Sequence, residues 1–282
     1  MQTPVNTLKG ALQSGAVQHG IWLTSGTSVL AELAGNAGFD WCLIDGEHGP
    51  NTVSEMLPQL QALAISGTPA VVRIANAEAW MVKQALDLGC QTVLVPMVDD
   101  AQTAQKMAHA MRYPPEGNRG MGAVLARATG WGAVADYPHS ANAQMCLLVQ
   151  AESARAVDNI DAIAATEGVD GVFVGPADLS ADMGYPGQPD HPDVEKAIDH
   201  LIARTVAAGK VAGIITFDQT RFKEYAEKGV TFLGVGGFGG AEQRLAPIGT
   251  ARHILTATAA SCAGAPFAFF GGDAVELDPL GS

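Results

Sequence analysis

The chain has 282 residues, a length that fits one domain built around a single large hydrophobic core. Hydrophobic residues make up 48% of the chain and charged residues only 16%, a composition that excludes a disordered protein. The formal net charge of −13 argues against nucleic acid or an anionic membrane as a partner, and no apolar stretch reaches the length that crosses a bilayer.

Eight short apolar runs recur along the chain, and each predicts a β-strand: Ile21–Thr24, Trp41–Asp45, Ala70–Ile74, Thr92–Pro96, Met145–Gln150, Gly171–Gly175, Val211–Thr216 and Thr231–Val235. Runs that are apolar at nearly every position are typical of strands buried on both faces. Stretches with helical spacing lie between them, among them Ser54–Ala64, Ala79–Leu88, Ala101–Met111, Val194–Ala208 and Gln219–Lys228. This alternation predicts an α/β fold, the TIM (β/α)8 barrel. An open doubly wound sheet is the alternative, but no GxGxxG motif follows the first strand.

One connection is longer than the others. Residues 112–144 separate the fourth and fifth predicted strands and contain the run YPPEGNRGMGAVLARATGW. Long connections in compact domains commonly carry a function. Two roles stay open for this segment: covering the active site, or contacting a neighbouring subunit.

The chain after the last strand reads GVGGFGG and then predicts a further helix over residues 242–260, which Pro247 would kink or delay. Residues 261–282 are rich in Gly, Ala, Pro and Phe and predict a tail. We therefore expect one barrel domain over residues 1–260, followed by a C-terminal tail over residues 261–282.

The cysteines show no CxxC or other ligand spacing: Cys42, Cys90, Cys146 and Cys262. Cys42 and Cys146 lie within apolar strand-like runs, where buried free thiols are expected. The N-terminal residues MQTPVNTLKG lack the apolar core of a signal peptide. Together these features favour a reducing, cytoplasmic location.

Active sites of such barrels lie at the C-terminal ends of the strands, so polar residues at those ends are the candidates. They follow strands two, three, five and six: Asp45, Glu47, His48, Arg73, Gln150, Glu152 and Asp178. The clustering of these side chains on one rim is the main indication of a functional site.

Glu152 and Asp178 come from different strands and together suit a hard cation with oxygen ligands, Mg²⁺ or Mn²⁺. Co²⁺ and Zn²⁺ are alternatives, because the ligand preferences of these metals overlap. Each acid alone could instead form a salt bridge or cap a helix. The turn Gly175-Pro176-Ala177-Asp178 offers backbone N–H groups that could hold a substrate carboxylate.

Arg73 can stabilise the negative charge that develops on an enolate, although an ion pair with Asp45 or Glu47 is the alternative. His48 is the natural general base because histidine titrates near neutral pH; the alternative is a surface histidine. A Schiff-base mechanism needs a lysine on the barrel interior, and no predicted strand carries one.

Six runs of the chain are more specific than a generic barrel: GFDWCLIDGEHGPN, PAVVRI, QTVLVPMV, RYPPEGNRGMG, LLVQAES and GVDGVFVGPADLSADMGY. They resemble the class II, metal-dependent pyruvate aldolases, with 4-hydroxy-2-oxoheptanedioate, 2-keto-3-deoxy-rhamnonate and 2-dehydro-3-deoxyglucarate aldolases as the nearest kinds. The resemblance covers about residues 5–236 and implies a barrel of the phosphoenolpyruvate/pyruvate type. It departs from the family after the eighth strand, where GVGGFGGAEQRLAPIG stands in place of a plain helical run.

The resemblance also implies residue roles. Glu152 and Asp178 would hold the metal, and Gln150, Ala177 and Asp178 would contact the pyruvate part of the substrate. Arg73 would steady the enolate.

His48 would be the base, with Asp87 raising its basicity. Asp87 lies near the end of the helix after strand three, and a nine-residue helix spans about 13 Å, so Asp87 should lie at the opposite end of the barrel from His48. We therefore predict that Asp87 reaches His48 of a neighbouring subunit, with a surface acid as the alternative. A homo-oligomer follows, either a hexamer arranged as a trimer of dimers or a trimer.

The expected function is therefore a metal-dependent aldolase that joins pyruvate to an aldehyde or reverses that reaction, in the catabolism of aromatic compounds or sugar acids. Trp22 and residues 119–127 would line the aldehyde pocket. Two alternatives stay open: a related carbon–carbon lyase or decarboxylase acting on a 2-oxo acid or acyl thioester, and a non-catalytic ligand-binding barrel.

Overall fold

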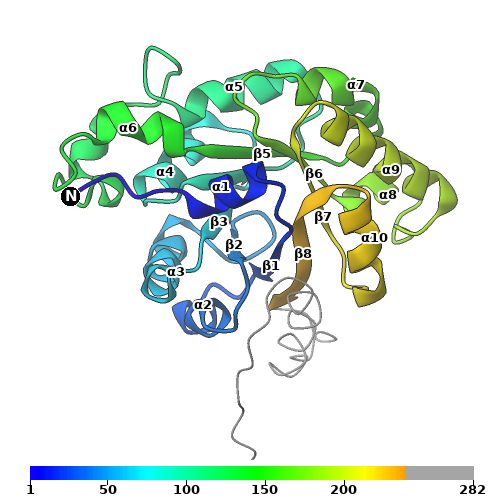
Figure 1. Cartoon of the computed structure of the whole chain (residues 1–282), viewed down its shortest axis with the longest axis horizontal. Coiled ribbons are helices and arrows are strands. Elements are labelled where there is room, and N and C mark those ends of the chain that lie inside the picture. Colours follow the sequence, from blue (N-terminus) through cyan, green and yellow to red (C-terminus); the bar gives the residue numbers. More distant parts are fainter. Residues whose placement is uncertain (239–282) are drawn as a thin grey trace, which may run out of the picture. The chain divides into compact units, whose positions relative to one another are not determined.

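The computed structural model describes residues 1–238, apart from the side chains of Ala123 and Phe238. Its strands form a closed barrel in which each strand pairs in parallel with the next, and β1 pairs with β8 (Figure 1). The strands are β1 (Gln18–Leu23), β2 (Trp41–Asp45), β3 (Ala70–Arg73), β4 (Thr92–Val95), β5 (Cys146–Ala151), β6 (Gly171–Val174), β7 (Val211–Ile215) and β8 (Val230–Phe238). The predicted barrel is confirmed, and the open doubly wound sheet is excluded.

The helices lie between successive strands in sequence, except for α1, which precedes β1. They are α1 (Thr7–Gln13), α2 (Ser28–Gly35), α3 (Val53–Ser66), α4 (Ala79–Asp87), α5 (Ala101–Met111), α6 (Tyr137–Gln144), α7 (Ala154–Ala164), α8 (Pro176–Asp182), α9 (Pro192–Ala207) and α10 (Phe222–Glu227). Local signals explain their ends. The helix α3, for example, begins with a capping box between Thr52 and Glu55 and ends at Gly67, whose φ of 74° suits glycine.

Aromatic side chains fill the barrel interior. Trp41 stacks on Phe232 with ring centroids 4.0 Å apart, and a Cβ atom on Gly20 would lie 1.9 Å from the Trp41 ring. Glycine at position 20 is therefore required for the tryptophan to fit. Leu8 and Leu12 of α1 belong to the same interior cluster and cover the end of the barrel where the strands begin. The opposite end, where the strands finish, is left for the site.

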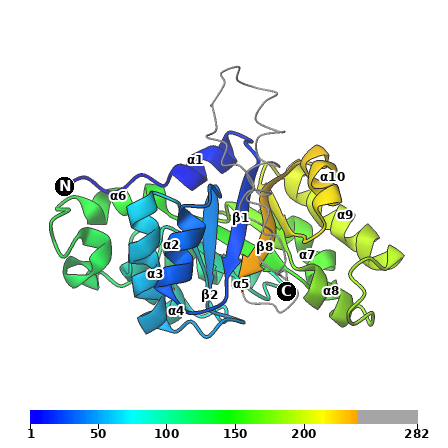
Figure 2. The same cartoon turned by 90° about the horizontal axis from the view of Figure 1, so that it is seen from below.

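Residues 112–144 lie at the end of the barrel where the strands begin. Arg127 donates to the carbonyl oxygen of Leu88 at 2.6 Å, just past the end of α4, and Thr3 near the N-terminus is hydrogen-bonded to Ser140. Figure 2 shows α6 beside the N-terminus. Because this segment joins the end of a helix to the start of a strand, topology places it away from the strand C-termini. The expectation that it covers the active site of its own chain is therefore wrong; contact with a neighbouring subunit stays a prediction.

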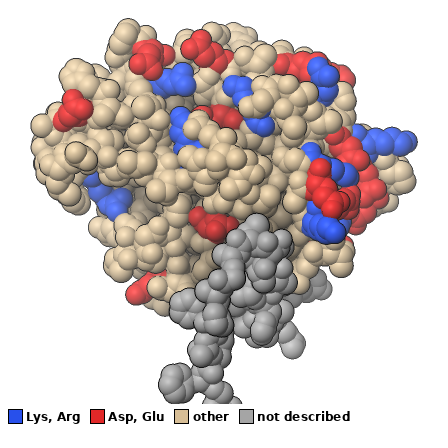
Figure 3. All heavy atoms as spheres, viewed as in Figure 1, with Lys and Arg blue, Asp and Glu red and all other residues tan. Residues whose placement is uncertain are grey.

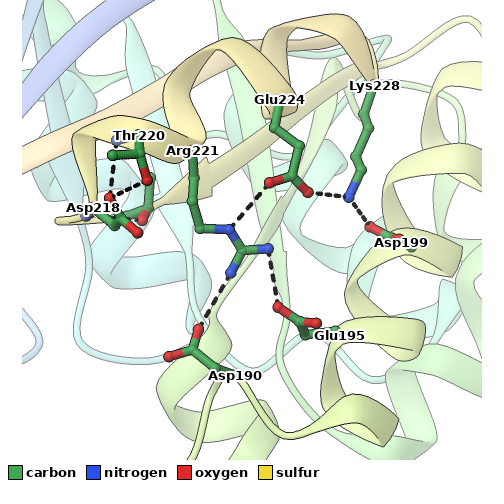
Figure 4. A network of polar contacts seen from close by, with 9 residues as sticks. Asp190, Glu195, Asp199, Asp218, Thr220, Arg221, Glu224 and Lys228 are labelled. Atoms are coloured by element: carbon green, nitrogen blue, oxygen red, sulfur yellow. Dashed lines mark hydrogen bonds and ion pairs between the residues drawn. The ribbon is translucent and has the colours of Figure 1, made fainter.

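Charged side chains of both signs interleave over α9 and α10 (Figure 3). Arg221 lies 3.2 Å from Asp190 and 3.2 Å from Glu195, and Lys228 bridges Asp199 and Glu224 at 2.7 and 2.6 Å (Figure 4). This network ties α10 to α9 on the surface of the barrel.

The predicted element boundaries agree closely with the structure, and α5 and β2 match at both ends. The predicted helix Gln219–Lys228 is divided into a short 3-10 turn, Gln219–Arg221, and α10. The predicted helix over residues 242–260, Pro247 within it, and the tail over residues 261–282 lie outside the described residues. Within residues 1–238, no helix is both long enough and apolar enough to cross a membrane.

Candidate active site

A buried ion pair joins the ends of β2 and β3 at the rim. Arg73 donates from Nε to Oδ1 of Asp45 at 2.8 Å and from Nη2 to Oδ2 at 2.6 Å. The register of the barrel explains the pair, since Asp45 and Arg73 are aligned at the ends of adjacent strands. Both side chains are buried, and a bidentate pair of this kind holds the guanidinium in one orientation.

Asp45 also organises the loop that carries His48. Its Oδ1 accepts hydrogen bonds from the backbone N–H groups of Glu47 and His48, at 3.1 and 3.3 Å. The His48 side chain is 61% exposed, and its Nε2 lies 3.8 Å from Oε2 of Glu47. The same Glu47 oxygen lies 2.9 Å from Nη1 of Arg73. The ion pairs that were the alternative reading of Arg73 therefore exist, and they connect Arg73 to His48 through Glu47.

Gln150 and Glu152 continue the cluster at the end of β5. Gln150 accepts a hydrogen bond from Arg73 at 3.4 Å and donates one to Oε2 of Glu152 at 2.5 Å. The other Glu152 oxygen, Oε1, accepts from the backbone N–H of Met97 at 2.7 Å. Glu152 is only 1% exposed. The structure thus brings Arg73, Gln150 and Glu152 into one hydrogen-bonded chain.

The acids of this rim are not neutralised by the chain. Burial raises the pKa of Glu152 to about 7, and the negative charges of Glu47 and Asp178 act in the same direction. Burial likewise raises the pKa of Glu47 to about 6, an effect that the Arg73 charge opposes and that Asp45 and Asp178 strengthen. Arg73 forms ion pairs with two of the four carboxyl groups at this rim, Asp45 and Glu47.

Asp178 lies in the first turn of α8, which follows β6, and its side chain is exposed at the rim. The first backbone bond of this helix runs from Leu179 N–H to the carbonyl oxygen of Gly175, which leaves the amide of Ala177 ahead of it. A Cβ atom on Gly175 would lie 2.3 Å from Oε2 of Glu152. Gly175 therefore leaves space for the Glu152 carboxylate, a role that the spacing GPAD did not indicate.

Two predicted site residues lie apart from this cluster. Trp22 is 5% exposed and packs against Trp41 and Phe173, at ring-centroid distances of 5.4 and 5.6 Å. Asp87 ends α4, as expected, and its Oδ1 accepts a hydrogen bond from the buried Arg119 at 2.7 Å. Neither contact tests the predicted roles, which stay predictions.

Arg119 and Arg127 were expected to line the aldehyde pocket with Trp22. They instead contact Asp87 and Leu88, at the end of the barrel where the strands begin. Within one chain, residues 119–127 therefore do not line a pocket at the strand C-termini, and lining the pocket of a neighbouring subunit stays a prediction.

The donor set at the rim fits a hard cation. Glu152 and Asp178 provide carboxylate oxygens, and a cation beside them would favour the ionised form of Glu152, which burial disfavours. Within the described part of the chain, no group of three or more His, Cys, Asp or Glu side chains is arranged to hold a metal ion by itself. A cation at this rim would therefore take its remaining ligands from water or from a substrate.

Three residues have larger roles in this geometry than the sequence indicated: Asp45, Glu47 and Met97. The two acids were visible in the run IDGEH as partners for Arg73. The bidentate pairing of Asp45 with Arg73 depends on the register of β2 and β3, and Asp45 in turn accepts hydrogen bonds from the backbone N–H groups of Glu47 and His48. Met97 contributes only a backbone N–H, so the identity of its side chain did not indicate a role in the site.

A closed parallel barrel whose strand ends gather buried, charged side chains is the architecture of a TIM-barrel enzyme. A family model described as HpcH/HpaI aldolase/citrate lyase matches residues 18–242. The chain belongs to this family, so the predicted resemblance and the class of carbon–carbon lyase are confirmed. Enzymes of this family in general depend on a divalent metal.

Individual members of the family are similar to this chain over most of its length. The chain is 52% identical over 236 residues to a hydroxypyruvate/pyruvate aldolase from Agrobacterium fabrum, which covers 84% of this chain and 89% of the relative. It is 48% identical over 231 residues to a 2-keto-3-deoxy-L-rhamnonate aldolase from Salmonella gallinarum, covering 82% and 86%. Among solved structures, an HpcH/HpaI family protein from Burkholderia cenocepacia J2315 matches with a TM-score of 0.80 and 37% identity, over 91% of this chain and 98% of that chain.

Proposed function

We propose that this chain is a metal-dependent aldolase that forms or cleaves a 4-hydroxy-2-oxo acid, using pyruvate and an aldehyde as the two halves. The observation that carries the proposal is the buried Glu152 at the end of β5, which Gln150 joins to Arg73 in one hydrogen-bonded chain at the strand C-termini. Relatives named as pyruvate and 2-keto-3-deoxy-L-rhamnonate aldolases support the substrate class.

Glu152 and Asp178 would hold the cation, Mg²⁺ or Mn²⁺, with Co²⁺ and Zn²⁺ as alternatives. A divalent cation bound there would supply the positive charge that makes the methyl group of pyruvate acidic at neutral pH. Two protein carboxylates leave positions open for the oxygens of a small substrate. This open arrangement suits a reaction in which the substrate itself completes the site.

The rest of the pyruvate would be held by neighbouring polar groups. Gln150 lies between Arg73 and Glu152 and can orient a substrate oxygen beside the acids. The turn formed by Gly175, Pro176 and Ala177 would receive the substrate carboxylate. Trp22, on the interior face of β1, would line the aldehyde pocket.

Arg73 would stabilise the enolate. Its Nε and Nη2 are occupied by Asp45, whereas its Nη1 faces Glu47 and Gln150 at the rim. A guanidinium fixed by Asp45 on one side presents Nη1 to the rim, where a substrate oxygen would share it with Glu47 and Gln150 as charge develops in the reaction.

His48 would move the proton of the methyl group. Its side chain is largely exposed, whereas its backbone is fixed by Asp45, so the imidazole can reach a substrate above the rim. Asp87 would assist from a neighbouring subunit, because its own place at the end of α4 is the wrong end of the barrel. A homo-oligomer, a trimer or a hexamer arranged as a trimer of dimers, is part of this proposal, as is a barrel domain that extends to residue 260.

The test is removal and return of the metal. Protein stripped with EDTA should lose pyruvate-forming activity on 4-hydroxy-2-oxo acids and regain it with Mg²⁺ or Mn²⁺; activity that survives complete chelation would refute the metal assignment. Pyruvate assayed with a panel of aldehydes and metals would identify the second substrate. His48→Ala should abolish turnover, and unchanged turnover would show that the base lies elsewhere.

A further inference from the structure

The turn after β4 has an unusual backbone. Met97 has a φ of 52°, in the left-handed region that glycine normally occupies. Within residues 1–238, only Trp131 shares this feature among residues other than glycine. This conformation is unfavourable for methionine, because its Cβ crowds the adjacent carbonyl oxygen. Strained residues of this kind persist where the surroundings require them.

The left-handed conformation aims two successive amides at the end of β5. The N–H of Met97 donates to Oε1 of Glu152 at 2.7 Å, and the N–H of Val98 donates to the carbonyl oxygen of Gln150 at 3.0 Å. The Gln150 side chain then donates to Oε2 of Glu152 at 2.5 Å. Each Glu152 oxygen therefore has one donor, and the carboxylate is held in a single orientation.

The Met97 side chain does not take part. It is 48% exposed, whereas Val95 and Val98 on either side are fully buried. What the site uses is the backbone direction, so the effect of a substitution should follow the preference of the new residue for positive φ rather than its size or polarity.

We infer that Met97 is a positioning residue for Glu152. Its left-handed backbone supplies the hydrogen bond that orients the carboxylate toward the cation position. This inference rests on the proposed function, since it assigns the orienting contact of a proposed metal ligand. Hydrogen bonds that orient metal ligands commonly change metal affinity by about 10–100-fold when they are removed.

The test compares Met97→Gly with Met97→Val, using Mn²⁺ binding to metal-free protein measured by isothermal titration calorimetry. Glycine adopts a positive φ readily and keeps the N–H, so its dissociation constant should stay within about threefold of wild type. Valine is β-branched and resists this conformation, so its dissociation constant should rise at least about tenfold. The matched control is the pair Trp131→Gly and Trp131→Val, which alters the other left-handed residue far from the rim and should leave Mn²⁺ affinity unchanged.

If Met97→Val does not fold, the N–H can be removed alone. Incorporation of the α-hydroxy acid analogue of methionine at position 97 replaces that N–H by an ester oxygen and should weaken Mn²⁺ binding about tenfold. Wild-type affinity in folded Met97→Val or in the ester analogue would overturn the inference, as would equal weakening by Gly and Val. Wild-type protein that binds no Mn²⁺ at all would instead refute the proposed metal site.

Discussion

Two buried arginines lie at opposite ends of the barrel, and their surroundings differ. Arg73, at the strand C-termini, is paired bidentately with Asp45 and lies 2.9 Å from Glu47. Arg119, at the other end, has one acidic partner, Asp87, at 2.7 Å. The first arginine shares its rim with more acids than it can neutralise, whereas the second is matched one to one.

The difference separates a cluster with excess acid from a cluster whose charges are matched. Arg119 lies over the rings of Tyr113 and Tyr137, with its guanidinium carbon 4.5 and 5.8 Å from their centroids, and so holds residues 112–144 together. At the rim, by contrast, burial raises the pKa of Glu47 and Glu152, and the neighbouring acids act in the same direction. Perturbed carboxyl groups beside an already paired arginine therefore mark the site better than burial alone.

The largest effect on activity should come from removing the negative charge of Glu152. Glu152→Gln keeps the size of the side chain but removes the proposed cation ligand, so kcat/KM for pyruvate formation should fall at least about 1,000-fold, or about 4 kcal/mol. Steady-state kinetics over a range of Mn²⁺ concentrations would measure it. Glu227→Gln, at a side chain 68% exposed, is the matched control. A loss smaller than tenfold would show that Glu152 is not a ligand.

Breaking the pair at the other end should reduce stability. Arg119→Met should lower the free energy of unfolding by about 3 kcal/mol, because it leaves Asp87 without its partner next to buried apolar groups. Urea denaturation would measure this change. The double variant Arg119→Met/Asp87→Asn should recover part of the loss, since it also removes the unpaired charge. Equal stability of the single and double variants would argue that the pair is not coupled.

The raised pKa of Glu152 predicts a pH dependence of stability in the absence of metal. A carboxyl group with a pKa of about 7 in the folded protein and an ordinary value of 4.5 in the unfolded chain binds its proton more tightly when folded. The metal-free protein should therefore lose about 2–3 kcal/mol of stability as the pH rises from 4.5 to 7, and less than about 1 kcal/mol more as the pH rises to about 8 and the ionisation is completed. Urea denaturation in EDTA would reveal the slope, and Glu152→Gln should flatten it. A wild-type slope of the opposite sign would contradict the buried-acid assignment.

The smallest effect is expected on the surface of α9 and α10. Lys228 is 32% exposed and bridges Asp199 and Glu224 (Figure 4). Lys228→Met should lower the free energy of unfolding by about 1 kcal/mol or less, because solvent screens exposed ion pairs. Thermal unfolding at low and high salt would test this. A loss of stability as large as that of Arg119→Met would mean that solvent exposure does not determine how much each ion pair contributes.

Much of the site could be predicted from the sequence because it sits at strand ends. Once eight buried runs were recognised, His48, Arg73, Gln150, Glu152 and Asp178 had to share one rim. The position of residues 112–144 was harder to predict, since a long connection suggests a lid over the active site. The segment follows the C-terminal end of α5, however, and that end lies where the strands begin. The contact of Met97 with Glu152 could not be predicted from the sequence, because the donor is a backbone N–H and not the side chain.

The sequence by itself determined the barrel, its strands and the residues that stand at the C-terminal ends of those strands, because continuous apolar runs and helical spacing are local properties of the chain. Only the tertiary structure decided how those residues are charged and held. The alignment of Asp45 with Arg73, the space that Gly175 leaves for Glu152, and the left-handed turn at Met97 each depend on strands that meet across the barrel. Contacts between distant segments set these features, and no local pattern encodes them.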